Sequence, residues 1–418
     1  MKYSIVTFGC RVNQADSVEM EAQLLATGRV SVDPQHADLV VVNTCSVTSA
    51  SDQGARQIIR KIARENPAAR IVVTGCYATR QPVELAALPG VVQVISNDRK
   101  DFFAEELGLT TAGRFGDGEG ACGADVVPGT AGRTAYTLRV QTGCDEACAY
   151  CIIPSTRGKG RSRPLAFVLS EIDRACAAGF REIALTGVHL GSYGRDLPEP
   201  ESLLRLLQAI EELAPANVQV RVSSLEPMDC SDEIVDLIAQ SRRFAPHFHL
   251  PLQHASDRLL VAMRRPYTIA YYRRLADRIR RVIPHASIGS DVIVGFPGET
   301  ADDFLQLEQY LIASPLTHVH VFPYSDRPGT EATAMKDKVH GSIVRDRAAR
   351  LRDISRGLAA AFQRAQHGAI RPGLTIDDGA TVVTDNYLKV RIPEGLERNE
   401  WVRVRLRTET EPLTAELV

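Results

Sequence analysis

The first hundred residues alternate short apolar runs with longer amphipathic segments. The apolar runs predict strands near residues 3–8, 39–43, 71–74 and 91–95. Segments such as SVEMEAQLLATG and ARQIIRKIAREN predict helices between them. Strands that alternate with helices form a parallel sheet with right-handed crossovers. We therefore expect the α/β class and an N-terminal parallel α/β sandwich over residues 1–110.

The same alternation resumes at residue 135. It predicts further strands near residues 136–141, 182–187, 218–224, 247–252, 288–296 and 318–323. Helices are expected near residues 166–178, 201–213, 231–241, 267–282 and 300–313. Six consecutive strand–helix units are enough for a partial (β/α)6 barrel, whose chemistry would lie at the carboxyl ends of the strands.

Different patterns separate and follow these two regions. Residues 111–134 are rich in glycine and poor in apolar residues, which predicts a flexible linker. An arginine-rich helix is expected over 344–365, so that the barrel with its trailing helix covers 135–366. From 367 to 418, YLKVRIP and WVRVRLR alternate apolar and charged residues, which predicts a small β-domain.

Composition limits the kind of protein. The 418 residues carry a formal net charge of −2, so global charge predicts no nucleic-acid partner, and any such partner must bind local patches. No apolar run approaches the ~18 residues of a membrane span, and no secretory signal is recognisable. We expect a cytoplasmic protein with no membrane partner. Its nine cysteines would then be thiols or metal ligands and not disulfides.

Apolar runs that end in a cysteine recur in the N-terminal region. YSIVTFGC ends at Cys10, VVVNTC at Cys45 and ARIVVTGC at Cys76. The carboxyl ends of parallel strands lie on one edge of a sheet, so these thiols should project towards one another. That geometry suits three thiolates on one metal centre. The alternative is three independent cysteines that pack as small hydrophobes.

A denser cysteine motif follows the first predicted barrel strand. In QTGCDEACAYCIIP, Cys144, Cys148 and Cys151 have the spacing C-x3-C-x2-C. Zinc normally takes a fourth protein ligand, and none follows at a suitable spacing. Three thiolates suit a cubane iron–sulfur cluster with one iron left open. Chance clustering is the alternative. The remaining cysteines, Cys122, Cys176 and Cys230, we interpret as structural or inert.

The C-x3-C-x2-C motif at the end of the first barrel strand resembles the radical S-adenosylmethionine superfamily. This resemblance implies that the open iron binds S-adenosylmethionine and that Tyr150 lies beside its adenine. TGVHLGSYG, VSSLEP and DVIVGFPGE resemble the family's further cofactor contacts, which implies roles for Gly187, Ser223, Glu226, Asp291 and Gly295. Without the resemblance, Gly187 would lie in a tight turn and Ser223 or Glu226 would cap the start of a helix. Asp291 would be a solvated loop carboxylate.

With Cys10, Cys45 and Cys76 ahead of such a barrel, the chain resembles the methylthiotransferases. The resemblance implies two [4Fe-4S] clusters, the second carrying the sulfur to be delivered. It also implies S-adenosylmethionine as radical source and methyl donor, and a small-protein electron donor. No catalytic residue is expected beyond the two clusters.

The motifs are most similar to the branch that modifies C2 of N6-threonylcarbamoyladenosine beside the anticodon of tRNA. The isopentenyladenosine branch usually has glutamine and methionine where this chain has Arg11 and Val12, whereas IPSTRGK also resembles the branch that acts on an aspartate of a ribosomal protein. Both remain alternatives. A non-catalytic RNA-binding iron–sulfur protein is a further one.

An RNA partner would be the anticodon loop of tRNA; no DNA partner is expected. The tail resembles the RNA-binding TRAM β-barrel, although residues 371–418 carry seven Lys or Arg against nine Asp or Glu. Positive charge gathers instead at 264–281, at 344–365 and in RGKGRSR, with Arg157, Lys159, Arg161 and Arg163. The alternative for each run is a solvated face. His249 and His254 we interpret as satisfied rim histidines, with a substrate-facing role as the alternative.

Overall fold

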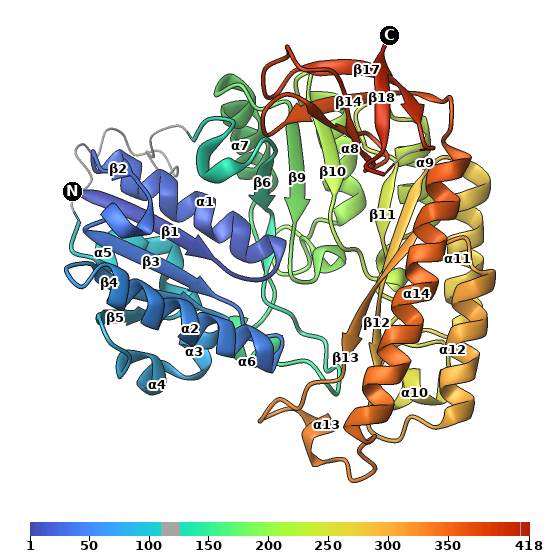
Figure 1. Ribbon diagram of the computed structural model, residues 1–418, viewed down its shortest axis with the longest axis horizontal. Coiled ribbons are helices and arrows are strands. Elements are labelled where there is room, and N and C mark those ends of the chain that lie inside the picture. The colour runs from blue at the N-terminus through green and yellow to red at the C-terminus, as the bar shows by residue number, and fades with distance from the viewer. Residues whose placement is uncertain (110–125, 410) are drawn as a thin grey trace.

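A parallel sheet, a partial barrel and a small β-barrel follow one another along the chain (Figure 1). The computed structural model describes residues 1–109, 126–409 and 411–418. The predicted α/β class and the order of the three units are confirmed. Cys122 and most of the predicted linker lie outside the described residues.

The N-terminal sheet has five parallel strands in the order β2-β1-β3-β4-β5. Valines fill both of its faces: Val40 and Val42 belong to one apolar cluster and Val41 to another. A sheet that is covered on both faces needs such continuous apolar runs. Its strands are β1 (Lys2–Thr7), β2 (Val30–Ser31), β3 (Leu39–Thr44), β4 (Arg70–Gly75) and β5 (Val91–Ile95). The helices are α1 (Arg11–Ala26), α2 (Ser49–Glu65), α3 (Cys76–Arg80), α4 (Pro82–Ala86) and α5 (Phe103–Glu106).

The central unit is an open barrel of two three-stranded parallel sheets, β10-β9-β6 and β11-β12-β13. Isolated parallel bridges from Val220 to Phe244 and from Ser224 to His249 join the two sheets. The strands are β6 (Tyr136–Arg139), β9 (Glu182–Thr186), β10 (Gln219–Val222), β11 (His247–His249), β12 (Ser287–Val294) and β13 (His318–Pro323). A short hairpin of β7 (Gln141–Thr142) and β8 (Arg161–Ser162) follows β6. All six predicted barrel strands are present.

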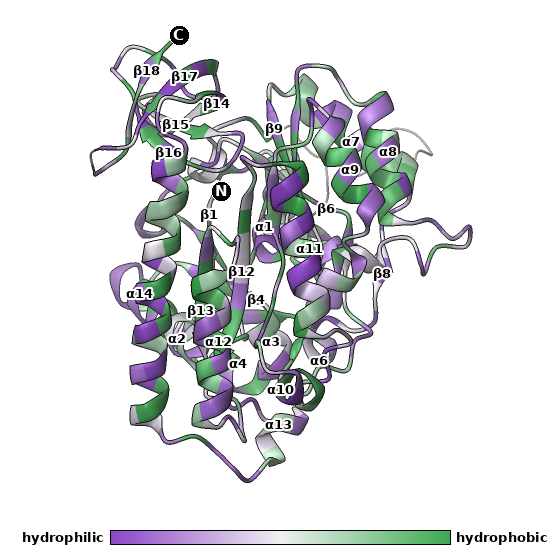
Figure 2. Cartoon of the chain, turned by 90° about the vertical axis from the view of Figure 1, so that its right-hand side faces the viewer, coloured by the Kyte–Doolittle hydropathy of each residue, from purple (hydrophilic) through white to green (hydrophobic). Residues whose placement is uncertain are grey.

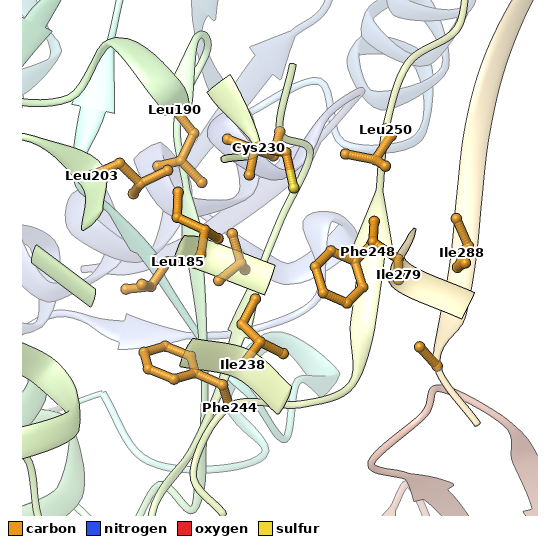
Figure 3. Packing of buried hydrophobic residues seen from close by; sticks show 14 of the residues in the cluster. Leu185, Leu190, Leu203, Cys230, Ile238, Phe244, Phe248, Leu250, Ile279 and Ile288 are labelled. Carbon is orange, nitrogen blue, oxygen red and sulfur yellow. The ribbon is translucent and has the colours of Figure 1, made fainter. Parts of the chain in front are cut away.

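Amphipathic helices cover the outside of this barrel. Figure 3 shows Leu185 and Leu203 in the apolar core between strands and helices, together with Cys230, which is fully buried there. The helices are α7 (Leu165–Ala177), α8 (Leu203–Leu213), α9 (Asp232–Gln240), α11 (Ile269–Val282), α12 (Ala301–Ala313) and α14 (Gly341–Ala365). Three short helices, α6 (Ile153–Arg157), α10 (Asp257–Ala262) and α13 (Glu331–Ala334), lie near the carboxyl ends of the strands (Figure 1). Figure 2 shows hydrophilic and hydrophobic positions interleaved along α11 and α14.

The C-terminal strands close into a five-stranded barrel in the order β14-β15-β16-β18-β17. This confirms the small β-barrel expected for the tail. Its strands are β14 (Ile370–Ile376), β15 (Thr381–Thr384), β16 (Lys389–Arg391), β17 (Trp401–Arg407) and β18 (Thr414–Leu417). It lies beyond the amino ends of the large barrel's strands, opposite the cysteine motif (Figure 1).

The turn between β15 and β16 attaches this small barrel to the rest of the chain. The centroids of the Tyr387 and His247 rings lie 4.8 Å apart. The Arg221 guanidinium lies 4.7 Å from the centroid of the Tyr387 ring. The Tyr387 hydroxyl also accepts a 2.7 Å hydrogen bond from Arg11 in the N-terminal unit. One aromatic side chain of the small barrel therefore contacts both of the other units.

No helix in the described part of the chain is long and apolar enough to cross a membrane.

Replacing Tyr387 separates these contacts. We expect Tyr387→Ala to lose the ring contacts with His247 and Arg221, costing about 2–3 kcal/mol of unfolding free energy. Tyr387→Phe keeps the ring and loses one exposed hydrogen bond, costing about 1 kcal/mol or less. Chemical denaturation and hydrogen exchange at β10, β11 and β15 would measure the difference. Equal unfolding free energies and equal exchange rates in the two variants would show that the ring contacts do not stabilise the attachment.

Candidate functional site

The first cysteine triplet lies at the carboxyl edge of the N-terminal sheet, where β1 and β3 point towards the barrel (Figure 1). Cys10 precedes α1, Cys45 follows β3, and Cys76 begins α3. The loops pack tightly: a Cβ on Gly9 would lie 2.5 Å from the Cys45 Cβ. A Cβ on Gly75, whose φ is +102°, would lie 2.1 Å from the Thr44 carbonyl oxygen. Only glycine permits both close approaches.

The thiols of this triplet act on one another electrostatically. Burial, together with the charges of Cys10 and Cys76, raises the pKa of Cys45 to about 11, against a hydrogen bond from the Val47 backbone. Cys76 behaves in the opposite way. Burial opposes its ionisation, but the positive charges of Arg157 and Lys100 outweigh burial and lower its pKa. The site therefore supplies the positive charge that a thiolate ligand needs.

A buried carboxylate holds those cations in place. Asp16 on α1 is fully enclosed and pairs with Lys100 at 2.8 Å and with Arg157 at 2.8 Å. Arg139 on β6 approaches the other carboxylate oxygen at 3.2 Å. Burial opposes ionisation of Asp16, but these cations keep its pKa below the usual range. Arg139 and Arg157 belong to the barrel unit, so this network joins the two units as well as charging the site.

The second triplet lies in the loop after the β7 strand. A Cβ on Gly143, whose φ is +74°, would lie 1.9 Å from the Lys159 carbonyl oxygen, so the loop folds directly onto residues 158–160. The Cys151 amide donates to the Cys148 carbonyl at 3.1 Å, which forms a tight turn. Burial, together with the neighbouring charges of Cys148 and Cys144, raises the pKa of Cys151 to about 12.

Polar side chains surround this second triplet. Arg265 donates to the Cys148 sulfur at 3.2 Å and forms an ion pair with Glu226. His189 lies 2.7 Å from Asp229. Burial disfavours a charged imidazole, yet the hydrogen bonds with Asp229 and the Cys144 sulfur raise the pKa of His189 to about 10. Each side of the loop thus presents a positively charged donor to a sulfur.

The two triplets are neighbours. Helix α3, which begins at Cys76, packs against α6, which directly follows the second motif. The Asn97 side-chain amide contacts the Cys76 sulfur at 3.6 Å and donates to the Thr156 carbonyl at 2.8 Å. A single side chain therefore links Cys76 to the helix that directly follows the second cysteine motif.

The residues expected around the cofactor lie on the barrel strands and their loops. Tyr150 is half-buried and packs against a small apolar cluster that includes Phe296. The Ser223 hydroxyl is buried, and within the described residues it has no hydrogen-bond partner. A Cβ on Gly187 would press on the Gln141 side chain at 3.1 Å. Ser223 is thus suitably placed for a ligand, whereas Gly187 already has a packing reason to be glycine.

Two further members of that set have partners within the protein. Asp291 lies 3.0 Å from His249. The Gly295 amide donates to Glu299 at 2.6 Å, and a Cβ there would lie 2.4 Å from a Val344 methyl. Glu299 is buried and also pairs with Arg347, so it orders the GFPGE loop. Contacts of Asp291 and Gly295 with the cofactor remain a prediction.

The expected RNA-contact group needs one correction. Arg157 is only 5% exposed and donates to Asn13 at 2.5 Å as well as to Asp16, so it does not face solvent. Arg163 is half-buried and approaches Asp101 at 3.1 Å. Lys159 and Arg161 are exposed on the hairpin beside the cysteine motif and remain candidates for RNA contact.

Comparison with known proteins agrees with this architecture. Residues 2–96 match an uncharacterised protein family, UPF0004, and residues 138–311 match the radical SAM superfamily. The chain is 34% identical to the threonylcarbamoyladenosine tRNA methylthiotransferase MtaB of Bacillus subtilis over 92% of this chain and 88% of that protein. It is 34% identical to the Aquifex aeolicus MtaB over 97% of this chain and all of that protein.

The chain belongs to the methylthiotransferase family. Among solved structures, it resembles the radical S-adenosylmethionine methyltransferase TsrM from Kitasatospora setae, at a TM-score of 0.57 and 18% identity, over 79% of this chain and 76% of that one. At that identity the likeness concerns the fold alone.

The spacing of the sulfurs within each cysteine triplet distinguishes a single metal ion from an iron–sulfur cluster as the group that this methylthiotransferase binds. A single tetrahedral zinc ion would hold thiolate sulfurs about 3.8 Å apart. In the described chain, the only group of three potential ligands whose atoms all lie within 4.8 Å of one another is a set of histidines. Neither cysteine triplet closes to the size of one ion. An iron–sulfur cluster, which spreads its ligands over several irons, fits both triplets better.

Sequence reasoning missed the polar side chains around the methylthiotransferase's cysteines. No spacing pattern connects these residues, because tertiary folding alone brings them together. Arg265 lies in a basic run that we interpreted as surface, yet it is buried against Cys148. One signal was available in the sequence: Asp16 is a charged residue within a helix that begins directly after a cysteine. The missed residues are Asp16, Asn97, Lys100, Arg139, His189, Asp229 and Arg265.

Removing the buried carboxylate tests the network. We expect Asp16→Asn to cost about 3–5 kcal/mol of unfolding free energy, since it leaves buried cations unpaired. It should also reduce the iron retained by the N-terminal triplet. Asp101→Asn is the matched control, because Asp101 pairs with the same Arg139 but its side chain is 36% exposed, and its loss should cost about 0–1 kcal/mol. Denaturation and iron analysis would measure both, and equal stability of the two variants would contradict the account.

Proposed function

We propose that this chain is a tRNA methylthiotransferase that inserts a methylthio group at C2 of N6-threonylcarbamoyladenosine beside the anticodon. The observation that supports the proposal is that Asn97 contacts the Cys76 sulfur of one triplet and also the α6 helix, which directly follows the other triplet. One triplet alone would suit radical chemistry without sulfur delivery. Two adjacent triplets suit a reaction in which a carbon is activated at one centre and receives sulfur from the other.

The two triplets would hold [4Fe-4S] clusters, and S-adenosylmethionine would bind at the barrel triplet. When bound, these groups supply the radical, the sulfur and the methyl group. The protein's own part is to hold thiolates in a poorly solvated place. Arg265 and the protonated His189 stabilise negative charge on Cys148 and Cys144, and Lys100 with Arg157 does so for Cys76.

Ser223 supports a ligand inside the barrel. A buried hydroxyl without a partner costs about 1–3 kcal/mol, which a polar group of a bound cofactor would recover. Tyr150 offers a flat apolar ring at the same end of the barrel, where an adenine could lie. These two side chains come from different segments, and the cysteine loop brings Tyr150 to the carboxyl ends of the strands.

The substrate assignment rests on the relatives. The MtaB proteins of four bacteria named as threonylcarbamoyladenosine tRNA methylthiotransferases match over 86–97% of this chain. A ribosomal protein uS12 methylthiotransferase from Desulfotalea psychrophila is 33% identical, and a tRNA-2-methylthio-N(6)-dimethylallyladenosine synthase from Herpetosiphon aurantiacus is 35% identical over 80% of this chain. Sequence identity to the three branches is nearly equal, so the experiment below offers the substrate of each branch.

RNA contact would use local charge, because the net charge is −2. Lys159 and Arg161 lie exposed beside the cysteine motif, where they can contact phosphates without reading sequence. The target base must leave its stack, as bases in an anticodon loop can. The proposal places the enzyme in the reducing cytoplasm, where its thiols stay available, with a small-protein electron donor. A role of the C-terminal barrel in RNA binding remains part of the proposal.

Cysteine variants separate the two centres. With the anaerobically reconstituted full chain, we expect Cys148→Ala to abolish both S-adenosylmethionine cleavage and tRNA methylthiolation. Cys45→Ala should keep cleavage while losing methylthiolation, because only sulfur delivery is affected. Cys176→Ala, on the outer helix α7, is the matched control and should retain both activities. Retained methylthiolation in Cys45→Ala would contradict the proposal.

The substrate is tested by offering each candidate separately. Nucleoside mass spectrometry should show the 2-methylthio derivative on tRNA that carries N6-threonylcarbamoyladenosine. tRNA that carries isopentenyladenosine and the ribosomal protein uS12 should remain unmodified. Modification of either in place of the first substrate would move the chain to that branch, and modification of none would contradict the function.

A further inference from the structure

Three histidines on the strands β11 and β13, which flank β12, face one another. His249 is the last residue of β11, and His318 and His320 lie two residues apart on β13. One nitrogen from each ring lies within 4.8 Å of the corresponding nitrogens of the other two. Val319, between the β13 histidines, packs into the outer apolar core, so the histidines point to the opposite face of the sheet.

The ring nitrogens on the far side of two of these histidines already have partners. His249 Nε2 lies 3.0 Å from Asp291 Oδ1 on the adjacent strand β12. His318 Nδ1 lies 3.0 Å from the Thr317 hydroxyl. A metal-ligating histidine characteristically donates its other ring N–H to a carboxylate or a neutral acceptor, which fixes its orientation. His249 Nδ1 and His318 Nε2 are the nitrogens that this arrangement leaves for a metal.

Those two nitrogens converge on the same space above Gly289. A Cβ at Gly289 would lie 2.4 Å from His318 Nε2 and 2.9 Å from His249 Nδ1. Any other residue would therefore occupy the place where the two nitrogens meet. Gly289 pairs directly with His318 across β12 and β13, and its φ lies outside the left-handed region, so its backbone conformation does not explain the glycine. Space between the imidazoles does.

We propose that His249, His318 and His320 bind a divalent transition-metal ion, for which zinc is the expected occupant. Imidazole nitrogen suits zinc, and neutral imidazoles are the form that coordinates it. Coordination at about 2.1 Å draws the nitrogens to about 3.4 Å apart, a short movement for the exposed His320 side chain.

This site has an open coordination position. Three protein nitrogens leave the fourth position of a tetrahedral ion to water or to an oxygen ligand, the arrangement of reactive zinc sites more than of structural ones. Asp291 is only partly buried and holds His249 in place. We expected Asp291 to contact the cofactor; the proposed site gives it the role of orienting a metal ligand.

The test measures metal content and the ligands of the metal. The full chain, with its clusters reconstituted anaerobically, is incubated with Zn²⁺, freed of excess ion and analysed for zinc and iron. We expect wild type and His36→Gln, an exposed histidine in the N-terminal unit, to retain about one zinc per chain more than His318→Gln. Zinc X-ray absorption should show nitrogen and oxygen neighbours without sulfur.

Two further variants guard against a fold defect in His318→Gln. Gly289→Ala keeps every histidine and fills the space between them, so it should also lose the zinc. Asp291→Asn should weaken zinc binding roughly 10–100-fold. Iron content should be unchanged throughout, because the cysteines are untouched. Equal zinc in wild type and His318→Gln, or sulfur neighbours around the zinc, would overturn the site. Neither result bears on tRNA modification, which is measured separately.

Discussion

The buried carboxylate of Asp16 is the constraint on which the rest of the structure depends. A carboxylate without exposure is tolerable only when cations surround it, and here they come from the N-terminal unit, as Lys100, and from the barrel, as Arg139 and Arg157. The pairing fixes how the two units meet. It also fixes Lys100 and Arg157 beside Cys76, so the ion network that joins the units is the one that favours a thiolate there.

This arrangement explains why the two cysteine triplets share one interface. Each stands where strands end, because the carboxyl ends of both parallel sheets supply loops to the same side. Asn97 then connects Cys76 to helix α6, which follows the second triplet, and Arg265 and His189 complete the positive surroundings on the barrel side. A methylthiotransferase must bring a radical and a sulfur donor to one carbon, and the packing of α3 against α6 suits that requirement.

Much of this fold follows from sequence periodicity, since strands that are covered on both faces, such as β3, need unbroken apolar runs. The placement of Cys10, Cys45 and Cys76 on one edge of the sheet could be predicted as well, because each follows a strand of the parallel sheet. The side chains that charge the site could not, since Asp16 and Arg157 are 141 positions apart and look like ordinary surface residues. For the same reason Arg157 was assigned to RNA. The cluster of His249, His318 and His320 could not be predicted, because it depends on the pairing of Gly289 with His318 across two strands, and periodicity does not specify which residues pair.

The most direct test of the central claim, two neighbouring clusters held on two triplets, is electron paramagnetic resonance of the reduced, reconstituted chain. Paramagnetic centres that lie close together broaden and split each other's signals. The account predicts that the wild-type spectrum differs from the sum of the spectra of Cys45→Ala and Cys148→Ala, each of which keeps one intact triplet. A wild-type spectrum equal to that sum, or one identical to a single variant's, would contradict it.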